Sequence, residues 1–367
     1  MKTVMLVFGT RPEAIKMAPL VKELINHSYL RPCVCLTAQH RSMLDQVMDF
    51  FELNADYDLD LMKPNQSLIK LAGKALEGLS DVINEVEPAA ILVQGDTTST
   101  LCGALAGFYS RVPVGHVEAG LRTGDIYSPY PEEMNRLLST RLAKWHFAPT
   151  ETNKANLINE GVGQEDIFVT GNTVIDALFW ARNKQEGSMG FSSDQVRPYI
   201  LITGHRRESF GVGFESICKA ISILAKDCPD YDFIYPMHLN PNVREPVNRI
   251  LGGISNVRLI EPLSYPDFVS LMNGSYFILT DSGGVQEEAP SLGKPVLVMR
   301  ETTERNEALN GGVRLVGTDT EMIANEGLKL IKDKKHYQFM SEAQNPYGDG
   351  FAAKKIIEVL SRDLVDM

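Results

Sequence analysis

Residues 3–25, TVMLVFGTRPEAIKMAPLVKELI, indicate the fold class most clearly. They open with an apolar run at 3–8, which is typical of a strand buried on both faces. Thr10 and Glu13 form a capping box, and Pro12 suits the first turn of a helix. Apolar residues then recur at the spacing of one helix face: Ala14, Met17, Ala18, Val21, Leu24 and Ile25. The segment predicts a buried strand followed at once by an amphipathic helix, the repeating unit of a parallel α/β sheet.

The same unit repeats on both sides of a polar stretch at 183–198, which is typical of a linker. Before this stretch, strands are predicted at 32–37, 89–94, 112–117, 145–149 and 167–171; after it, at 199–204, 232–237, 256–261, 276–281 and 294–299. The last residues, 350–367, carry a helical apolar stripe. We therefore predict two Rossmann-like, doubly wound parallel-sheet domains, residues 1–182 and 183–349.

The acidic composition limits the classes of partner. The chain has a formal net charge of −11, whereas non-specific binders of nucleic acid or anionic membranes are usually basic. We expect no signal peptide, and no apolar run approaches the roughly 20 residues of a membrane span. The cysteines are odd in number and form no CxxC pair: Cys33, Cys35, Cys102, Cys218 and Cys228. The apolar surroundings of Cys33 and Cys35 predict buried, reduced thiols, which fit the cytoplasm.

Polar segments follow the predicted strands, at the edge where open α/β sheets bind ligands. They are FGTRPE, QGDTTS and HVEAGLR in the first half and TGHRRE, MHLNP and TDSGG in the second. If the two sheets face one another, all six segments line one central cleft. No GxGxxG, Walker A, HExxH, GxSxG or zinc-ligand spacing occurs. Dinucleotide, nucleoside-triphosphatase, serine-hydrolase and metal chemistry are therefore disfavoured.

The segment TDSGGVQEEAP, residues 280–290, has the features of a phosphate site. Ser282 supplies a hydroxyl, Gly283 and Gly284 let a backbone approach closely, and the N–H groups of the following helix point at an anion. Glu288 lies where a carboxylate could accept both hydroxyls of a ribose. A plain turn, in which the glycines serve packing, is the alternative.

Basic side chains also follow predicted strands. His205, in GHRRE, suits an anion or a proton transfer near neutral pH, and His238 follows the next strand in the same way. Arg11 and Lys16 lie at the start of the first helix, where a cation opposes the helix dipole unless an anion is bound. Solvated turns and a solvated lysine are the alternatives.

Acidic residues follow two apolar strands of the first half. At Asp96 and Glu118, partial burial and neighbouring charges can shift the pKa of a carboxyl, as a catalytic acid or base requires. Asp96 alone is also compatible with a helix N-cap. Glu132 and Glu133 follow Pro131 and are compatible with a plain helix start.

Together these segments resemble the non-hydrolysing UDP-N-acetylglucosamine 2-epimerases of bacteria. The resemblance runs through nearly the whole chain, in FGTRPEAIKMAPL, TAQHRSMLDQV, QGDTTST, PVGHVEAGLRTGD, SPYPEEMNR, GNTVIDAL, TGHRRESFG, HLNPNVREPV, LTDSGGVQEEAPSLGKPVLVMR, TTER and NPYGDG. It implies a glycosyltransferase-B-like architecture, with two Rossmann-like domains around a deep cleft. It also implies that the helix of 350–367 crosses back to the first domain.

The resemblance further implies interconversion of UDP-N-acetylglucosamine and UDP-N-acetylmannosamine without NAD, another cofactor or a metal. UDP is eliminated across C1–C2 to give enzyme-bound 2-acetamidoglucal, and it re-adds while a proton reaches the other face of C2. The leaving diphosphate needs donors and cations, and the sugar needs carboxylates. A cytoplasmic homodimer that supplies N-acetylmannosamine units for surface polysaccharide is expected.

Each candidate residue has a role by resemblance. The expected catalytic residues are Asp96, Glu118, Glu132, His205 and Lys16, and the last two meet the sugar or the diphosphate. Further substrate contacts are Arg11, Ser282, Gly283, Gly284 and Arg305 at the phosphates, Glu288 at the ribose, and Leu263 and Phe268 in the stretch that holds the uracil. Gln39, Arg206 and His238 lie in stretches where some relatives bind a second UDP-N-acetylglucosamine as an activator. Asp125 and Glu133 receive no role, and Arg136 is either a salt-bridge partner or a substrate contact.

Three alternatives share parts of this pattern. A hydrolysing epimerase releases free N-acetylmannosamine and UDP. A glycosyltransferase of the same architecture needs an acceptor site and a membrane-facing patch in its first domain, which the sequence does not show. A non-catalytic sugar-nucleotide sensor has no need of Asp96, Glu118 and Glu132 together.

Overall fold

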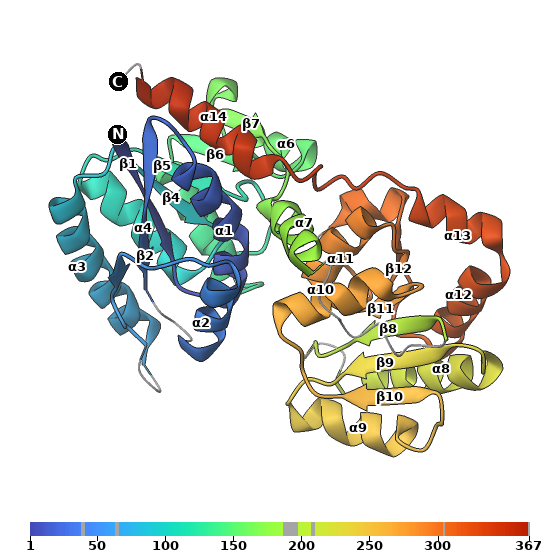
Figure 1. Ribbon diagram of the computed structural model, residues 1–367. Coiled ribbons are helices and arrows are strands. Elements are labelled where there is room, and N and C mark those ends of the chain that lie inside the picture. Colours follow the sequence, from blue (N-terminus) through green and yellow to red (C-terminus); the bar gives the residue numbers. More distant parts are fainter. Residues whose placement is uncertain (38–40, 63–65, 186–196, 207–209, 304, 366–367) are drawn as a thin grey trace. The chain divides into compact units, whose positions relative to one another are not determined.

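The chain forms two compact α/β units. The computed structural model describes residues 1–37, 41–62, 66–185, 197–206, 210–303 and 305–365. Unit 1 comprises Met1–Ala177 and Tyr347–Met367, and unit 2 comprises Leu178–Pro346. Each unit holds one sheet of parallel strands flanked by helices (Figure 1). The predicted fold class, two doubly wound parallel sheets, is confirmed.

The seven-stranded sheet of unit 1 has the order β3-β2-β1-β4-β5-β6-β7. Its strands are β1 (Lys2–Phe8), β2 (Leu30–Leu36), β3 (Tyr57–Asp58), β4 (Ala90–Gln94), β5 (Val114–Val117), β6 (Trp145–Ala148) and β7 (Ile167–Val169). The strand order reverses between β1 and β4, which makes this place the topological switch point where open α/β sheets bind ligands.

The helices of unit 1 are α1 (Arg11–Ile25), α2 (Arg41–Phe50), α3 (Leu68–Val86), α4 (Thr98–Tyr109), α5 (Glu132–Leu142), α6 (Glu151–Asn159), α7 (Thr173–Gln185, which runs across the boundary into unit 2) and α14 (Ala352–Val365). Several of them, among them α1, α3, α4 and α6, begin after a serine or threonine that caps them. The capping box of α1 is present: Thr10 accepts the N–H of Glu13, and the carboxylate of Glu13 accepts the N–H of Thr10. In α4, a Cβ on Gly103 would lie 2.7 Å from Val93, so glycine lets this helix pack closely on the sheet.

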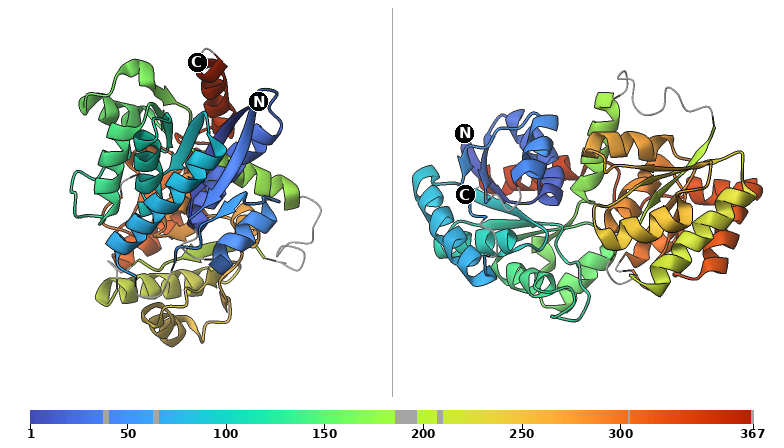
Figure 2. Two further views of the ribbon diagram at one scale, coloured as in Figure 1. Left: turned by 90° about the vertical axis from the view of Figure 1, so that its left-hand side faces the viewer. Right: turned by 90° about the horizontal axis from the view of Figure 1, so that it is seen from below.

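The C-terminal helix α14 completes unit 1 by packing on α1. The last turn of α14 lies beside the start of β1 (Figure 2). The ammonium of Lys2 donates to the carbonyl of Leu364 at 2.5 Å, and the indole of Trp145 donates to Asp363 at 2.7 Å. Helix α14 is therefore part of the packing of the first sheet.

The six-stranded sheet of unit 2 has the order β10-β9-β8-β11-β12-β13. Its strands are β8 (Tyr199–Thr203), β9 (Asp232–Pro236), β10 (Val257–Ile260), β11 (Ile278–Thr280), β12 (Val296–Val298) and β13 (Val313–Leu315). Its helices are α8 (Val212–Asp227), α9 (Pro241–Leu251), α10 (Tyr265–Gly274), α11 (Gly283–Glu288), α12 (Thr320–Lys332) and α13 (Lys334–Ser341). The strand order reverses here between β8 and β11, so this sheet also has a switch point.

Two features differ from the sequence prediction. The strands β3 and β13 were not predicted; they have two and three residues and lie at the edges of their sheets, where a short strand needs no long apolar run. The linker predicted at 183–198 begins too early, because 183–185 belong to α7. Residues 186–196 of that prediction lie outside the described residues.

Candidate active site

Two acids lie at the carboxyl edge of the sheet of unit 1, after neighbouring strands. Asp96 follows β4 and Glu118 follows β5 directly. Glu118 has a φ of 66°, a left-handed backbone conformation that glutamate rarely adopts. Such a conformation costs about 1–3 kcal/mol and persists where the surrounding structure enforces it, often at functional sites.

The carboxylate of Glu118 is held by two donors. The ammonium of Lys16, on α1, and the side-chain amide of Gln94, at the end of β4, both donate to its Oε2. The side chain of Glu118 is 8% exposed and that of Lys16 is 16% exposed. The alternative that Lys16 is a plain solvated lysine is therefore wrong, because its charge lies against a predicted catalytic acid.

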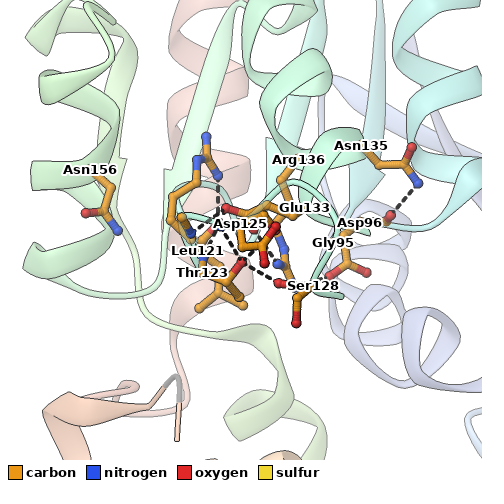
Figure 3. Close-up of polar contacts among 12 residues, drawn as sticks. Gly95, Asp96, Leu121, Thr123, Asp125, Ser128, Glu133, Asn135, Arg136 and Asn156 are labelled. Carbon is orange, nitrogen blue, oxygen red and sulfur yellow. Dashed lines mark hydrogen bonds and ion pairs between the residues drawn. The ribbon is translucent and has the colours of Figure 1, made fainter. Parts of the chain in front are cut away.

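The carboxylate of Asp96 is paired with Arg136 of α5 at 2.5 Å (Figure 3). The other terminal nitrogen of this guanidinium, Nη1, lies 2.8 Å from the carboxylate of Glu133. Glu133 also accepts the backbone N–H groups of Thr123 and Gly124. Burial by itself would lower the pKa of Arg136, but the two carboxylates outweigh burial and raise it. Arg136 is thus a salt-bridge partner, and the expectation that Glu133 is only a helix start is wrong.

Glu133 remains ionised by the same contacts. Burial would raise the pKa of this carboxyl, but the hydrogen bonds from Arg136, Gly124 and Thr123 outweigh burial and hold the pKa below its ordinary value. The buried carboxylate ties α5 to the loop that precedes it, as Figure 3 shows.

The remaining predicted residues of unit 1 occupy helix starts and a loop. Arg11 is the first residue of α1, and Glu132 is the first residue of α5; both side chains are half-buried. Asp125 is exposed and accepts the N–H of Tyr127 at 2.9 Å. The alternative that Asp96 caps α4 is wrong, because Thr97 is the N-cap of that helix.

The carboxyl edge of the sheet of unit 2 is organised around a buried aspartate. Asp281 follows β11, and its Oδ2 accepts the backbone N–H groups of His205 and Arg206 at 2.7 and 2.8 Å. The ring of His205 lies with its Nδ1 3.5 Å from Asp281 and stacks on His238, with 5.4 Å between ring centroids. Asp281 therefore fixes the backbone that presents His205.

The imidazole of His205 is partly open to solvent, with 42% of the side chain exposed. Partial burial lowers its pKa, the nearby His238 and Arg206 lower it further, and Asp281 opposes them. The net direction is downward, so the ring is largely neutral near pH 7 and can accept a proton or a hydrogen bond.

The glycine-rich turn of unit 2 combines a helix start with a guanidinium. Ser282 is the N-cap of α11, and its side chain makes no capping bond. A Cβ on Gly283 would lie 2.5 Å from the guanidinium carbon of Arg305, so only glycine lets Arg305 lie against this turn. Arg305 is oriented by Glu287, which accepts its Nε–H at 2.6 Å. Backbone N–H groups of Gly283 and Gly284 beside a planar cation form a site suited to an anion.

The predicted ribose and uracil residues lie near one another in unit 2. Glu288, at the end of α11, is buried and accepts the hydroxyl of Tyr265 at 2.9 Å. Tyr265 begins α10, which also carries Phe268, and Leu263 precedes that helix. Leu263 and Phe268 are half-buried, as residues that contact a ligand often are.

The other candidates divide between described and undescribed positions. Arg206 and His238 lie at the carboxyl edge of the sheet of unit 2. The backbone N–H of Arg206 bonds to Asp281, and the ring of His238 stacks on that of His205. Gln39 lies outside the described residues. Among the described residues, no cluster of three or more His, Cys, Asp or Glu side chains is arranged to hold a metal ion. In the same part of the chain, no helix has both the length and the apolar character needed to cross a bilayer.

Sequence reasoning missed the partners that hold the site. Gln94, Glu133 and Asp281 received no role. Gln94 contacts Glu118, Asp281 holds the backbone of His205, and Glu133 contacts the arginine that pairs with Asp96. Asp281 carried a usable signal, because it follows an apolar strand as Asp96 does. Glu133 also carried a local signal, the i,i+3 spacing to Arg136 within α5. Gln94 is 24 residues from Glu118, and no local pattern marks that contact.

The fold and these two edges define a glycosyltransferase-B-like α/β protein, with acids at the edge of one sheet and a glycine-rich turn suited to an anion at the edge of the other. A family model described as UDP-N-acetylglucosamine 2-epimerase matches residues 22–361. The chain belongs to this family and is an epimerase.

Individual relatives agree over the full length. The UDP-N-acetylglucosamine 2-epimerase of Escherichia coli K12 is 56% identical over 374 residues, covering 99% of this chain and all of that protein. The crystal structure of the enzyme from Neisseria meningitidis bound to UDP-GlcNAc is 51% identical, with a TM-score of 0.90 and coverage of 99% and 100%. The enzyme from Methanocaldococcus jannaschii in complex with UDP-GlcNAc and UDP is 32% identical, with a TM-score of 0.80 and coverage of 98% and 99%.

Proposed function

We propose that this epimerase converts UDP-N-acetylglucosamine to UDP-N-acetylmannosamine reversibly and without hydrolysis. The observation that carries the proposal is the pair of carboxylates after β4 and β5, each with its own cation: Asp96 with Arg136, and Glu118 with Lys16. A protein that only binds a sugar nucleotide has no need of two such pairs at one sheet edge. An enzyme that moves protons and stabilises positive charge does need them.

The proposed route is an elimination followed by an addition. The C1–O bond to UDP breaks with its electron pair leaving on UDP, and a carboxylate takes the proton from C2, which gives 2-acetamidoglucal. UDP then re-adds at C1 while a proton is delivered to the opposite face of C2. Because the C2 proton is weakly acidic, departure of UDP runs ahead of proton loss and C1 becomes positively charged. Asp96, Glu118 and Glu132 are the proposed acids and bases, and no face of C2 is assigned to any one of them.

We assign the nucleotide to the residues of unit 2. Ser282, Gly283, Gly284 and Arg305 provide donors and a cation for the diphosphate, and Glu288 provides a carboxylate for the ribose. This assignment is supported by the geometry of the turn and by related proteins whose structures contain UDP or UDP-GlcNAc. Arg11 and His205 are assigned to the diphosphate side, where a cation and a donor stabilise the leaving group.

Isotope exchange tests this route. The protein is incubated with UDP-N-acetylglucosamine in D2O, and the products are followed by NMR and mass spectrometry. We expect deuterium at C2 of both epimers and little free UDP. Absence of deuterium at C2 would overturn the elimination route, and free N-acetylmannosamine with stoichiometric UDP would show the hydrolysing reaction instead.

We also propose a cytoplasmic homodimer whose product supplies N-acetylmannosamine units for surface polysaccharide. Five buried free thiols support a reducing compartment. Large exposed apolar side chains lie in the first turn of α3 and in the last turn of α4, and they support contact with a second copy: Leu68, Ile69, Phe108 and Tyr109. Sedimentation velocity tests the dimer, since Ile69→Asp combined with Tyr109→Asp should shift the protein to monomer. Unchanged dimers in this variant would place the interface elsewhere.

A further inference from the structure

The turn that carries Asp96 is held at three successive residues by side chains from three other elements. The bonds run from His116 Nε2 to the carbonyl of Gly95 (2.7 Å), from Asn135 Nδ2 to the carbonyl of Asp96 (2.8 Å), and from the hydroxyl of Thr97 to the carboxylate of Glu13 (2.5 Å). Figure 3 shows Asn135 pointing at Asp96 from α5. Loops lie at the protein surface, where backbone carbonyls are open to water. Side-chain donors on the two successive carbonyls of Gly95 and Asp96, next to the bond of Thr97, therefore indicate a backbone fixed in one orientation.

His116 acts here as a hydrogen-bond donor. A carbonyl oxygen can only accept, so Nε2 of the ring carries the hydrogen. The side chain is fully buried in β5, and burial lowers its pKa to about 4, which leaves the ring neutral with its single proton on Nε2. Nδ1 finds no partner among the described residues. All the polar contact that this imidazole makes is therefore directed at the turn.

Asn135 extends the same constraint through α5. Its amide holds the main chain of Asp96, and the next residue, Arg136, holds the carboxylate of Asp96. Asn135 is 5% exposed and Arg136 is 8% exposed, so both donors are held by the packing of α5 while Asp96 stays partly exposed. One turn of one helix thus fixes both the backbone and the side chain of a single residue.

Glu13 links the turn after β4 to the turn after β1, the neighbouring strand at the switch point. Besides the hydroxyl of Thr97, its carboxylate accepts the N–H groups of Gly9 and Thr10 and the hydroxyl of Thr100. The turns after β1 and β4 are therefore tied through one buried side chain. Lys16 lies on the helix that begins at the first of these turns, so the elements that carry Lys16 and Asp96 are joined by the same buried side chain.

We propose that His116 and Asn135 are positioning residues for the epimerase reaction, which hold the carboxylate of Asp96 in its reactive orientation. The inference rests on the proposed function, because it needs Asp96 to act on the sugar. A displacement of about 1 Å at a reacting group can lower turnover by about 10²-fold. Loss of either bond should therefore reduce kcat while UDP binding, which belongs to unit 2, is unchanged.

Four variants test the proposal in the full-length protein. His116→Leu and Asn135→Leu remove the donors without adding charge, and each should lower kcat by about 10²-fold with KM within about threefold. His116→Gln places an amide donor at a similar reach and should restore most of kcat. Asn156→Leu is the matched control, because its amide also donates to a turn carbonyl, that of Gly120 at 2.9 Å, and Asn153 provides a second donor there. We expect its kcat to remain near that of the wild type.

The outcomes separate this inference from the proposed function. Circular dichroism and UDP titration establish folding, and Asn135→Leu carries the test if His116→Leu does not fold. The pH profile of kcat for His116→Gln should match the wild type; loss of one limb would mean that His116 transfers a proton itself, which overturns the positioning role. Folded leucine variants with wild-type kcat, beside an inactive Asp96→Asn, would also overturn it. An active Asp96→Asn would instead overturn the proposed function.

Discussion

Asp96 in unit 1 and Asp281 in unit 2 have almost the same place in their sheets and opposite surroundings. Each follows a buried strand at a switch point. Asp281 is 1% exposed, and two backbone N–H groups bond to one of its oxygens. Asp96 is 27% exposed and meets one guanidinium. The aspartate with backbone donors supports the scaffold, and the aspartate with a side-chain cation remains partly exposed, as the proposed role of Asp96 requires.

The largest expected effect in this comparison is on turnover. Asp96→Asn keeps the size of the side chain but cannot exchange a proton, so kcat should fall by about 10²–10⁴-fold. Steady-state kinetics with UDP-N-acetylglucosamine measures this, and UDP titration should show unchanged affinity. A loss of UDP binding in the same variant would mean that Asp96 is structural, as Asp281 is.

The buried histidines of unit 1 should give the largest effect on stability. Burial, with a smaller contribution from His116, lowers the pKa of His146 to about 4, whereas the unfolded chain titrates near 6.5. Between these pH values the unfolded chain binds the extra proton, so the contribution to stability is complete above about pH 6.5 and is lost as the pH falls towards 4. The size is on the order of 3 kcal/mol.

The measurement is the difference between wild type and His146→Gln in urea unfolding at several pH values. A difference is needed because Asp176 has its pKa raised to about 6 by burial, and its stability contribution changes in the opposite sense, being lost as pH rises. His205→Gln is the control from unit 2, where the side chain is 42% exposed and the effect should be much smaller. A pH-independent difference for His146 would contradict the prediction.

Removal of the scaffold acid should cost stability. Asp281→Ala leaves the N–H groups of His205 and Arg206 without their acceptor in a buried place, at a cost of about 1–3 kcal/mol. Asp96→Ala should cost less, because Arg136 retains Glu133. Chemical unfolding of the two variants compares them. Equal losses would show that the two acids differ less than their surroundings suggest.

Backbone strain at Glu118 should give a smaller difference in stability, between its glycine and alanine variants. Glu118→Gly and Glu118→Ala both remove the carboxylate, but only glycine adopts a φ of 66° without steric cost. The glycine variant should therefore be the more stable of the two, by about 1 kcal/mol in thermal unfolding. At Asp281, which has no positive φ, the order should reverse. The same order at both positions would exclude strain at Glu118.

The smallest expected effect concerns the thiols, for which the two units should behave alike. All five cysteines are buried, and burial raises the pKa of Cys35 and Cys218 to about 12. A thiol reagent such as dithionitrobenzoate should label none of them in the native protein and all five after denaturation. Rapid labelling of a native cysteine would reveal local opening of its unit.

Much of this fold was predictable because strand–helix alternation is a local property. Long buried strands such as β1, β4 and β8 consist of apolar runs, and the capping box at Thr10 marks a helix start within four residues. The edge strands β3 and β13 were not predictable, because two or three residues are too few to show a hydrophobic periodicity. Their pairing depends on the neighbouring strand.

The residues of the candidate site could be predicted from the sequence, but the contacts between them could not. Asp96, Glu118, His205 and Ser282 follow from their places after strands, together with a resemblance that spans the chain. Whether Lys16 meets solvent or Glu118 could not be predicted, since the two are 102 residues apart. Arg136 remained open for the same reason, being 40 residues from Asp96.

Hydrophobic periodicity, composition and short motifs established the two parallel sheets, the sheet edge at which polar residues gather, and the family to which the chain is similar. These properties depend on residues a few positions apart, which one sequence displays directly. Packing established the rest: that Asp281 supports a backbone while Asp96 faces outward, that Glu133 is buried, and that His116 and Asn135 hold one turn. Such distinctions depend on which donors surround a carboxylate or a carbonyl, and those donors come from strands and helices that meet only in the folded chain.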